Sequence, residues 1–284
     1  MRTNPPLPIQ PAPELVDEDL APLLEPLAAP GFDRSPEHEA RQVRERLLGR
    51  VTRSLAAEST MVTARRRRVA RTAVAPGVQE QVLYATDSSR ALRPGEPSRV
   101  RLLQVAAGAG VDAALLGDVD RHREWLVVHG RVSMDRQVLA QRDYITASAG
   151  TPSPSLACLE EALVFARESE VAGEEAGHIV TVLDSEAGWP DFVPGIQRRV
   201  LWEGEGQAAL LYYAQPGAAV PLHSHGHDEE CLMLQGELFL DDVLLQEGDY
   251  QLAPAGTSHH TTQTDTGVVI YAHSDLDLRF VAPA

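Results

Sequence analysis

Three histidines and one glutamate in the last third of the chain have residue types and spacing that suit a metal ion. His223 and His225 are two residues apart, so in a β-strand both imidazoles point to the same face. Glu229 follows after a short turn, and His259 follows a Pro/Gly turn that begins a new strand. Three imidazoles and one carboxylate suit zinc, iron(II), manganese, nickel or copper, whereas calcium and magnesium prefer oxygen ligands. We therefore predict one divalent transition metal per chain.

Four residues near these ligands are candidates for the surrounding pocket. Cys231 has the strand parity of Glu229, which turns it toward the metal, either in a redox or supporting role or as a buried inert thiol. Met233 shares that face and is expected to fill the core. Tyr213 and Tyr250 are candidates to line or cap the cavity.

The chain from about residue 60 onward has the pattern of an all-β protein. Short runs of β-branched and aliphatic residues alternate with turns rich in Gly, Pro and Asp. Residues 74–79 match residues 192–197 at an offset of 118. Further matches at an offset of 106 pair residues 126–130 with 232–236, 143–144 with 249–250, and 149–151 with 255–257. We therefore predict two copies of one β-domain, at residues 59–170 and 171–284.

The first copy lacks the metal ligands of the second. The offset of 106 places Gly117, Val119, Arg123 and Ser153 where the three histidines and the glutamate stand. None of these four can rebuild the site. The first domain is therefore expected to be a structural or dimerisation partner, or a vacant ligand pocket.

The region before the two domains divides into a tail and a helix. Residues 1–34 are rich in proline, which prevents long helices or paired strands, so we expect a disordered tail. Residues 35–58 carry an apolar stripe every four residues between arginines, which predicts one amphipathic helix. That stripe would pack on the first domain or, alternatively, bind a partner or a second copy of the chain.

Composition excludes several functions. The net charge is −16 and every basic residue besides histidine is arginine, so lysine Schiff-base and Walker-type chemistry are excluded and binding to nucleic acid is disfavoured. The arginine run at residues 65–68 is expected to be solvated or paired with acidic residues. The sequence shows no membrane span or signal peptide, which favours a cytoplasmic protein, and two cysteines are too few for a disulfide framework.

The glycine and proline positions around the ligands resemble the cupin family. The first cupin motif is matched by Gly217-x5-His223-x-His225-x3-Glu229-x6-Gly236, and the second by Gly248-x5-Pro254-x-Gly256-x2-His259. Gln263 stands where the second motif ends in Asn. The resemblance implies two tandem jelly-roll β-barrels, a bicupin, with the metal inside the second barrel.

Residues 190–275 closely resemble the cupin-like domain of ChrR anti-sigma factors, and residues 60–165 resemble it in degenerate form. The resemblance implies zinc held by His223, His225, Glu229 and His259, with iron(II) or manganese as alternatives. It also implies a sensor of reactive oxygen or of a small molecule whose partner is a sigma factor or another regulatory protein. In that family a separate amino-terminal zinc module holds the sigma factor through a His-x3-Cys-x2-Cys pattern. This sequence has no cysteine before Cys158 and departs from the family there.

Two classes of function therefore stay open. The first is a metal-binding sensory or regulatory protein, without membrane contact and able to form a homodimer. The alternative is a metal-dependent dioxygenase or isomerase that acts on a small carbonyl or aromatic substrate, because a metal with an open position can activate oxygen or polarise a carbonyl.

Overall fold

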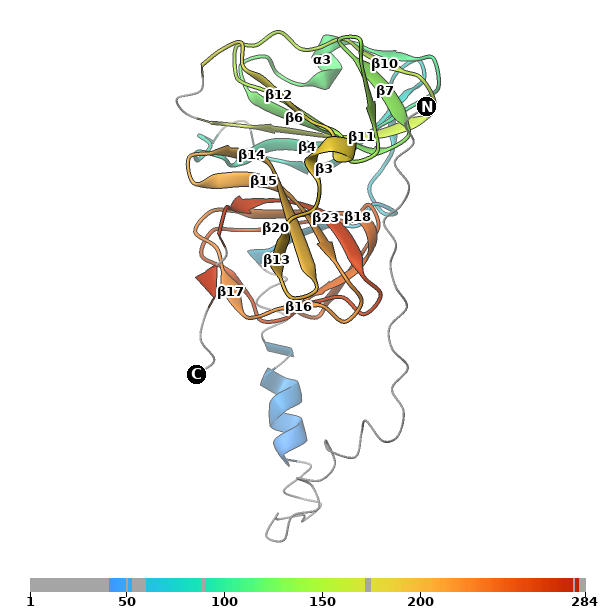
Figure 1. The fold of residues 1–284 in the computed structure, drawn as a ribbon. Coiled ribbons are helices and arrows are strands. Elements are labelled where there is room, and N and C mark those ends of the chain that lie inside the picture. The colour runs from blue at the N-terminus through green and yellow to red at the C-terminus, as the bar shows by residue number, and fades with distance from the viewer. Residues whose placement is uncertain are drawn as a thin grey trace.

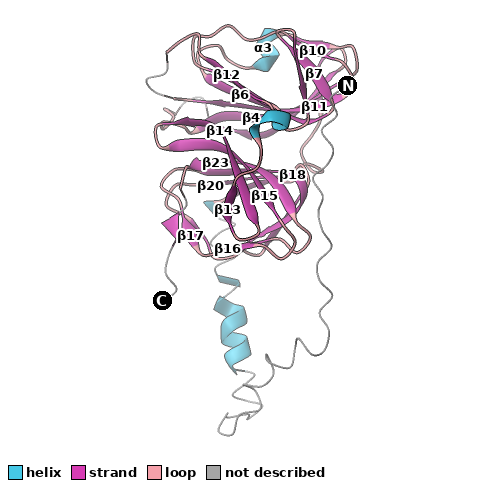
Figure 2. Cartoon of the chain, in the orientation of Figure 1, coloured by secondary structure: helices cyan, strands magenta, loops and turns pink. Residues whose placement is uncertain are grey.

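The computed structural model describes residues 41–49, 51–52, 60–87, 90–171, 175–277 and 279–280. Strands dominate these residues and form two barrels, one stacked on the other (Figure 1, Figure 2). The predicted all-β class with two jelly-roll barrels is confirmed. The expected proline-rich tail at residues 1–34 lies outside the described residues.

The first barrel is built from a large and a small antiparallel sheet. The large sheet has the order β12-β9-β6-β11-β4-β3-β2, and the small sheet has the order β5-β10-β7-β8. Their strands are β2 (Thr72–Ala75), β3 (Val78–Ala85), β4 (Pro97–Val105), β5 (Gly110–Val111), β6 (His122–His129), β7 (Arg131–Met134), β8 (Gln137–Ala140), β9 (Tyr144–Ala147), β10 (Leu156–Cys158), β11 (Ala162–Ser169) and β12 (Ile179–Val182). Two single-turn helices, α3 (Ala113–Leu116) and α4 (Asp184–Ala187), accompany these strands.

The second barrel repeats this plan. Its main sheet has the order β1-β20-β18-β23-β15-β14-β13, with β16, β19 and β22 pairing off that path, and β21-β17-β24 form a separate short sheet. The strands are β1 (Val62–Ala64), β13 (Asp191–Val193), β14 (Ile196–Gly204), β15 (Gln207–Ala214), β16 (Ala219–Val220), β17 (His223–Ser224), β18 (Glu229–Leu240), β19 (Val243–Gln246), β20 (Tyr250–Ala253), β21 (Ser258–His259), β22 (Thr262–Gln263), β23 (Val268–Asp275) and β24 (Arg279–Phe280).

Strand register reproduces the internal repeat. Arg123 pairs with Ala147 in the first barrel, and the residues 106 positions later, Glu229 and Ala253, pair in the second. The hairpins β2–β3 and β13–β14 correspond at the offset of 118, since Ala75 pairs with Val78 as Val193 pairs with Ile196. The two copies therefore share backbone pairing as well as sequence.

The segment that precedes each barrel contributes a strand to the sheet of the other barrel. Strand β1, which precedes the first barrel, pairs with β20 of the second, whereas β12 pairs with β9 of the first barrel. Just after β1, Arg65 is ion-paired with Asp249 at 2.8 Å, so part of the arginine run binds acidic side chains as expected. The predicted boundary between residues 170 and 171 is wrong in detail, because residues 179–182 belong to the first barrel's sheet and residues 62–64 to the second's.

Successive side chains of β18 point to opposite faces, so this strand contributes residues to two hydrophobic cores. Cys231 and Met233 point into the second barrel, where they pack with Leu238, Leu240 and Leu245. The alternate residues of the strand, Leu232 and Leu234, belong to a separate cluster that also contains Leu126 and Phe165 of the first barrel. A third cluster fills the first barrel around Trp125 and Val164. The chain therefore has a core in each barrel and one between them.

A buried ion-pair network crosses the contact between the barrels. Arg167 of β11 lies 2.7 Å from a carboxylate oxygen of Glu230 in β18 and 2.8 Å from one of Glu124 in β6. Tyr250 donates a hydrogen bond to Glu230 at 2.8 Å, and Tyr271 of the second barrel donates one to Glu124 at 2.7 Å. Burial alone would raise the pKa of Glu124, but the nearby guanidinium of Arg167 lowers it to about 2.

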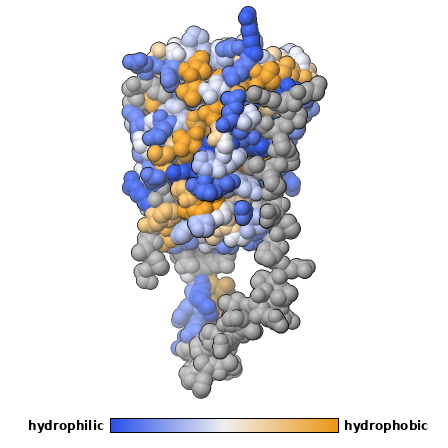
Figure 3. Space-filling model, viewed as in Figure 1, coloured by the Kyte–Doolittle hydropathy of each residue, from blue (hydrophilic) through white to orange (hydrophobic). Residues whose placement is uncertain are grey.

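The predicted amphipathic helix is described in part, over residues 41–49 and 51–52. Its apolar residues are exposed: 46% for Val43, 56% for Leu47, 55% for Leu48 and 53% for Val51. In Figure 3 this segment shows hydrophobic as well as hydrophilic side chains below the barrels. The stripe therefore does not pack on the first barrel as expected. No helix among the described residues is long and apolar enough to cross a membrane.

Candidate metal centre

Three short pieces of backbone bring the predicted ligands to one end of the second barrel. Strand β17 carries His223, which pairs directly with His259 of β21 in antiparallel register. His225 lies just beyond β17, and Glu229 is the first residue of β18. The turn at residues 254–257 is tied to the first motif, because the amide of Gly256 donates a hydrogen bond to the carbonyl of His225 at 2.9 Å. The two motifs therefore position each other.

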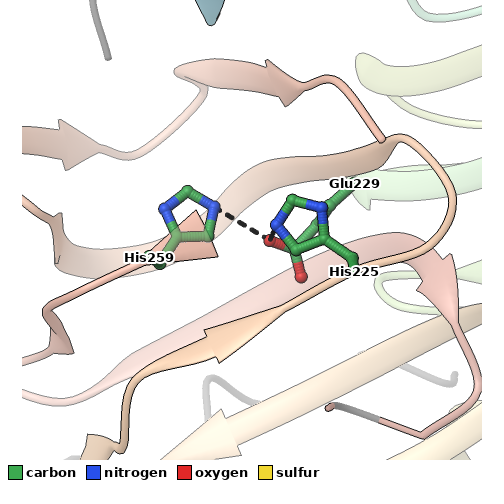
Figure 4. Close-up of side chains that lie close together, drawn as sticks. All are labelled: His225, Glu229 and His259. Carbon is green, nitrogen blue, oxygen red and sulfur yellow. Dashed lines mark ion pairs between the residues drawn. The ribbon is translucent and has the colours of Figure 1, made fainter. Parts of the chain in front are cut away.

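His225, Glu229 and His259 converge on one point (Figure 4). A carboxylate oxygen of Glu229 lies 3.0 Å from Nε2 of His259 and 3.4 Å from Nε2 of His225. One potential ligand atom from each of the three residues lies within 4.8 Å of the other two. In the part of the chain that the structure describes, this is the one such cluster of His, Cys, Asp or Glu residues.

His223 lies beside this cluster but outside it. Its ring centroid is 5.6 Å from that of His259 and 6.3 Å from that of His225. Nδ1 of His223 lies 3.0 Å from the carbonyl oxygen of Pro221. A hydrogen bond from Nδ1 to that carbonyl leaves the lone pair on Nε2, the nitrogen that would bind a metal. Three of the four predicted ligands are therefore in contact and the fourth is adjacent.

The donor atoms fit a cation. His225 is 2% exposed, and neither of its ring nitrogens has a hydrogen-bond partner among the described residues. A buried imidazole without hydrogen-bond partners is costly, and a bound metal would satisfy it. Burial lowers the pKa of His225, which favours the neutral form that ligates metals.

Glu229 and His259 form a charged pair in this structure. Burial alone would raise the pKa of Glu229, but its hydrogen bond with His259 lowers it to about 2. Burial alone would lower the pKa of His259, but the nearby carboxylates of Asp241 and Glu229 raise it to about 9. The protonated imidazole supplies the positive charge that a metal ion would bring to the same carboxylate.

Asp241 is a contact of the site that sequence reasoning missed. One of its carboxylate oxygens lies 3.6 Å from Nδ1 of His259, and the other accepts backbone hydrogen bonds from His260 at 2.8 Å and Thr261 at 3.0 Å. The repeat contained a signal, because Asp135 occupies the equivalent position and accepts a backbone hydrogen bond from Ser155 at 2.8 Å. An aspartate retained in both copies holds the loop that carries the last ligand.

A cavity of about 70 Å³ adjoins the cluster inside the second barrel. Its polar lining includes Glu229, His223, Thr262, Thr264 and Tyr212. Hydrophobic side chains form most of the remaining wall, among them Ile196, Val220, Leu238, Leu240, Val268 and Ile270.

The four predicted pocket residues divide between two places. Cys231 lines the cavity, where burial raises the pKa of its thiol well above the usual range, so it is a buried protonated thiol. Met233 packs in the same core. Tyr213 and Tyr250 do not line the cavity and belong to the cluster between the barrels. The tyrosine that lines it is Tyr212, on the opposite face of β15 from Tyr213.

The first barrel has a guanidinium at the equivalent position. Arg123 is fully buried, and its Nη1 donates a hydrogen bond to Oγ of Ser153 at 2.6 Å. Its other nitrogens donate to the carbonyl oxygens of Arg121, Ser148 and Thr151. A side chain at Gly117 would meet Arg123, since a Cβ there would lie 3.1 Å from its Cγ and Cδ. The lost ligands have thus been replaced by an arginine and the space that it needs.

Comparisons with known proteins agree with the cupin fold. Residues 178–276 match the ChrR cupin-like domain. A protein from Nostoc punctiforme described as a candidate dioxygenase is 16% identical with a TM-score of 0.59, and the alignment covers 79% of this chain and 88% of that one. A variant of Bacillus subtilis oxalate decarboxylase is 13% identical with a TM-score of 0.56, covering 78% of each chain.

The Escherichia coli protein Ylba is 15% identical with a TM-score of 0.59, covering 76% of this chain and 90% of that one. No curated protein sequence matches the chain. At these identities the likeness to solved structures establishes the fold and leaves the activity open. The chain therefore has the fold of a bicupin, and residues 178–276, which form most of its second barrel, match the ChrR cupin-like domain.

Proposed function

We propose that the second barrel binds one divalent transition metal through His223, His225, Glu229 and His259, and that the chain is a sensory or regulatory protein. The observation that carries the metal site is the convergence of His225, Glu229 and His259, with both nitrogens of the buried His225 lacking hydrogen-bond partners. A small turn of the His223 ring, whose Nε2 is left free by the contact to Pro221, would complete the shell.

The regulatory role is supported by the match to the ChrR cupin-like domain. Four protein donors around zinc make a closed shell, which is typical of structural and signalling sites rather than of catalytic ones. The signal would be a small molecule that enters the cavity beside Glu229, and the partner would be a sigma factor or another regulatory protein.

Elemental analysis of the purified chain tests this proposal. We expect about one zinc per chain that survives dialysis, and no oxygen uptake by the protein. A metal content near zero after purification from zinc-supplemented medium would refute the metal site. The prediction of zinc would be wrong if iron or manganese were retained instead.

A metal-dependent enzyme is the second candidate, and the cavity favours it. Glu229, which belongs to the cluster, and His223, which lies beside it, both line the cavity, so a substrate there would touch these two proposed ligands. A bound iron(II) or manganese ion would supply Lewis-acid or redox chemistry. Protein purified without oxygen should then hold iron and consume oxygen when supplied with a small ketone. Tight zinc and no oxygen consumption would exclude the dioxygenase.

A further inference from the structure

The volume and the polarity of the cavity beside Glu229 limit which ligands it can hold. Its volume of about 70 Å³ gives room for on the order of five water-sized atoms. Leu238, Leu240 and Val268 are among the aliphatic side chains that form most of its wall, and each of these three lies within the core of the second barrel. A hydrocarbon group of a ligand can be buried against such a wall without the cost of desolvating polar atoms.

Charge is confined to the end of the cavity at the ligand cluster. Glu229 and His223 are the titratable groups there besides the Cys231 thiol and the Tyr212 phenol, and no arginine is among the described lining residues. The hydroxyl of Thr264 already donates to the carbonyl of Glu237 at 2.7 Å. The buried hydroxyl of Thr262 has no hydrogen-bond partner among the described residues and is free to bind a ligand atom.

We propose that this site takes a small aliphatic monoanion, whose oxyanionic head would enter as a fifth ligand to the metal and whose branched hydrocarbon remainder would lie in the cavity. This inference rests on the metal site proposed above. A divalent ion together with the Glu229 carboxylate leaves one net positive charge, which one anionic oxygen group balances. A second anionic group would be buried against aliphatic side chains, and no guanidinium is among the described lining residues to pair it, which is strongly unfavourable. Arg198 lies behind the lining residue Tyr212 and donates a hydrogen bond to the carbonyl of Leu276.

Calorimetric titration of the metal-loaded full chain tests the proposed ligand class. Isobutyrate and oxalate have the same number of non-hydrogen atoms but differ in charge, and acetate lacks the two branching methyl groups of isobutyrate. We expect isobutyrate to bind about tenfold tighter than acetate because two more carbons are buried. We also expect isobutyrate to bind at least tenfold tighter than oxalate. Metal content is measured after each titration, so that removal of the ion by oxalate is not counted as binding.

Two neighbouring alanines provide a matched test of location. Ala218 lines the cavity and is half-buried, whereas Ala219 is exposed and outside the lining. Ala218→Leu should fill the cavity and weaken isobutyrate binding at least tenfold with unchanged metal content, and Ala219→Leu should change neither.

Equal affinities for isobutyrate and oxalate, or unchanged isobutyrate binding in Ala218→Leu, would overturn the proposed ligand class while leaving the metal site intact. Loss of the metal site is a different result, seen as no bound metal before any ligand is added. The failure of this inference and the failure of the proposed function are therefore distinguished in the same experiment.

Discussion

The guanidinium of Arg123 donates a hydrogen bond to the hydroxyl of Ser153 at 2.6 Å, and these two residues occupy the positions that Glu229 and His259 occupy in the second barrel. The first barrel therefore has a positively charged side chain at the position where the second barrel gathers its proposed metal ligands. Its nitrogens connect the start of β6 with the loop that follows β9, as the proposed metal ligands connect β18 with the loop that follows β20.

Replacement of this arginine should affect stability and not metal content. Arg123→Met leaves the Ser153 hydroxyl and two buried carbonyl oxygens without their donor, so we expect a loss of about 2 kcal/mol or more in the free energy of unfolding. Chemical denaturation and elemental analysis of the same preparation measure both quantities. A variant that loses half of its metal would show that the first barrel holds an ion of its own.

The contact between the barrels should depend strongly on Arg167. Arg167→Met leaves the carboxylates of Glu124 and Glu230 buried without their counter-charge, and breaking such a pair costs about 3–5 kcal/mol. The more exposed ion pair of Arg121 and Glu170 provides the control, and Arg121→Met should cost less than about 1 kcal/mol. Equal effects of the two substitutions would contradict a role for this network in stability.

Glu96 should contribute stability that disappears in acid. Burial alone would raise its pKa, but the hydrogen bond from Arg90 lowers it to about 2, below the ordinary value of 4.5. Because the folded state holds this carboxylate ionised, its contribution is complete above about pH 4.5 and is lost as the pH falls toward 2. The parent chain should therefore lose more stability than Glu96→Gln between pH 5 and pH 3 in denaturant titrations. Parallel pH profiles for the two proteins would rule out this contribution.

Asp241 should position His259, and the repeat offers a matched control. Asp241→Asn keeps an oxygen for the amides of His260 and Thr261 but removes the charge that faces Nδ1 of His259. Loss of such an outer contact typically weakens metal binding by about 10–100-fold. Asp135→Asn makes the same change in the first barrel, where Ser153 replaces the histidine, and should leave metal affinity unchanged. Competition with a chromogenic chelator measures both constants, and equal constants would exclude a positioning role.

Features encoded by local pattern and by the repeat could be predicted from the sequence. The offset of 106 predicted two copies of one domain, and the structure has the equivalent strand pairings of Glu229 with Ala253 and of Arg123 with Ala147. Strand parity correctly placed Cys231 and Met233 on the inward face of β18. The inward face of β15 was missed because Tyr212 and Tyr213 are adjacent aromatic residues, and hydrophobicity alone does not say which of the two faces the barrel.

Long-range contacts gave no such local signal. The exchange of β1 and β12 between the barrels depends on pairing with strands far along the chain, and no property of residues 62–64 or 179–182 specifies the partner. The ion pair of Arg167 with Glu230 joins residues 63 positions apart, and in sequence both look like exposed strand residues. Burial against a second barrel is a tertiary effect that reverses this expectation.

Two adjacent histidines give the most direct test of the metal centre. His259 is buried against Glu229, whereas His260 is exposed and lies outside the cluster. Stoichiometric titration with zinc should show one site per chain in the parent and in His260→Ala, and none in His259→Ala. If His259→Ala bound zinc with the stoichiometry and affinity of His260→Ala, the metal centre described above would be contradicted.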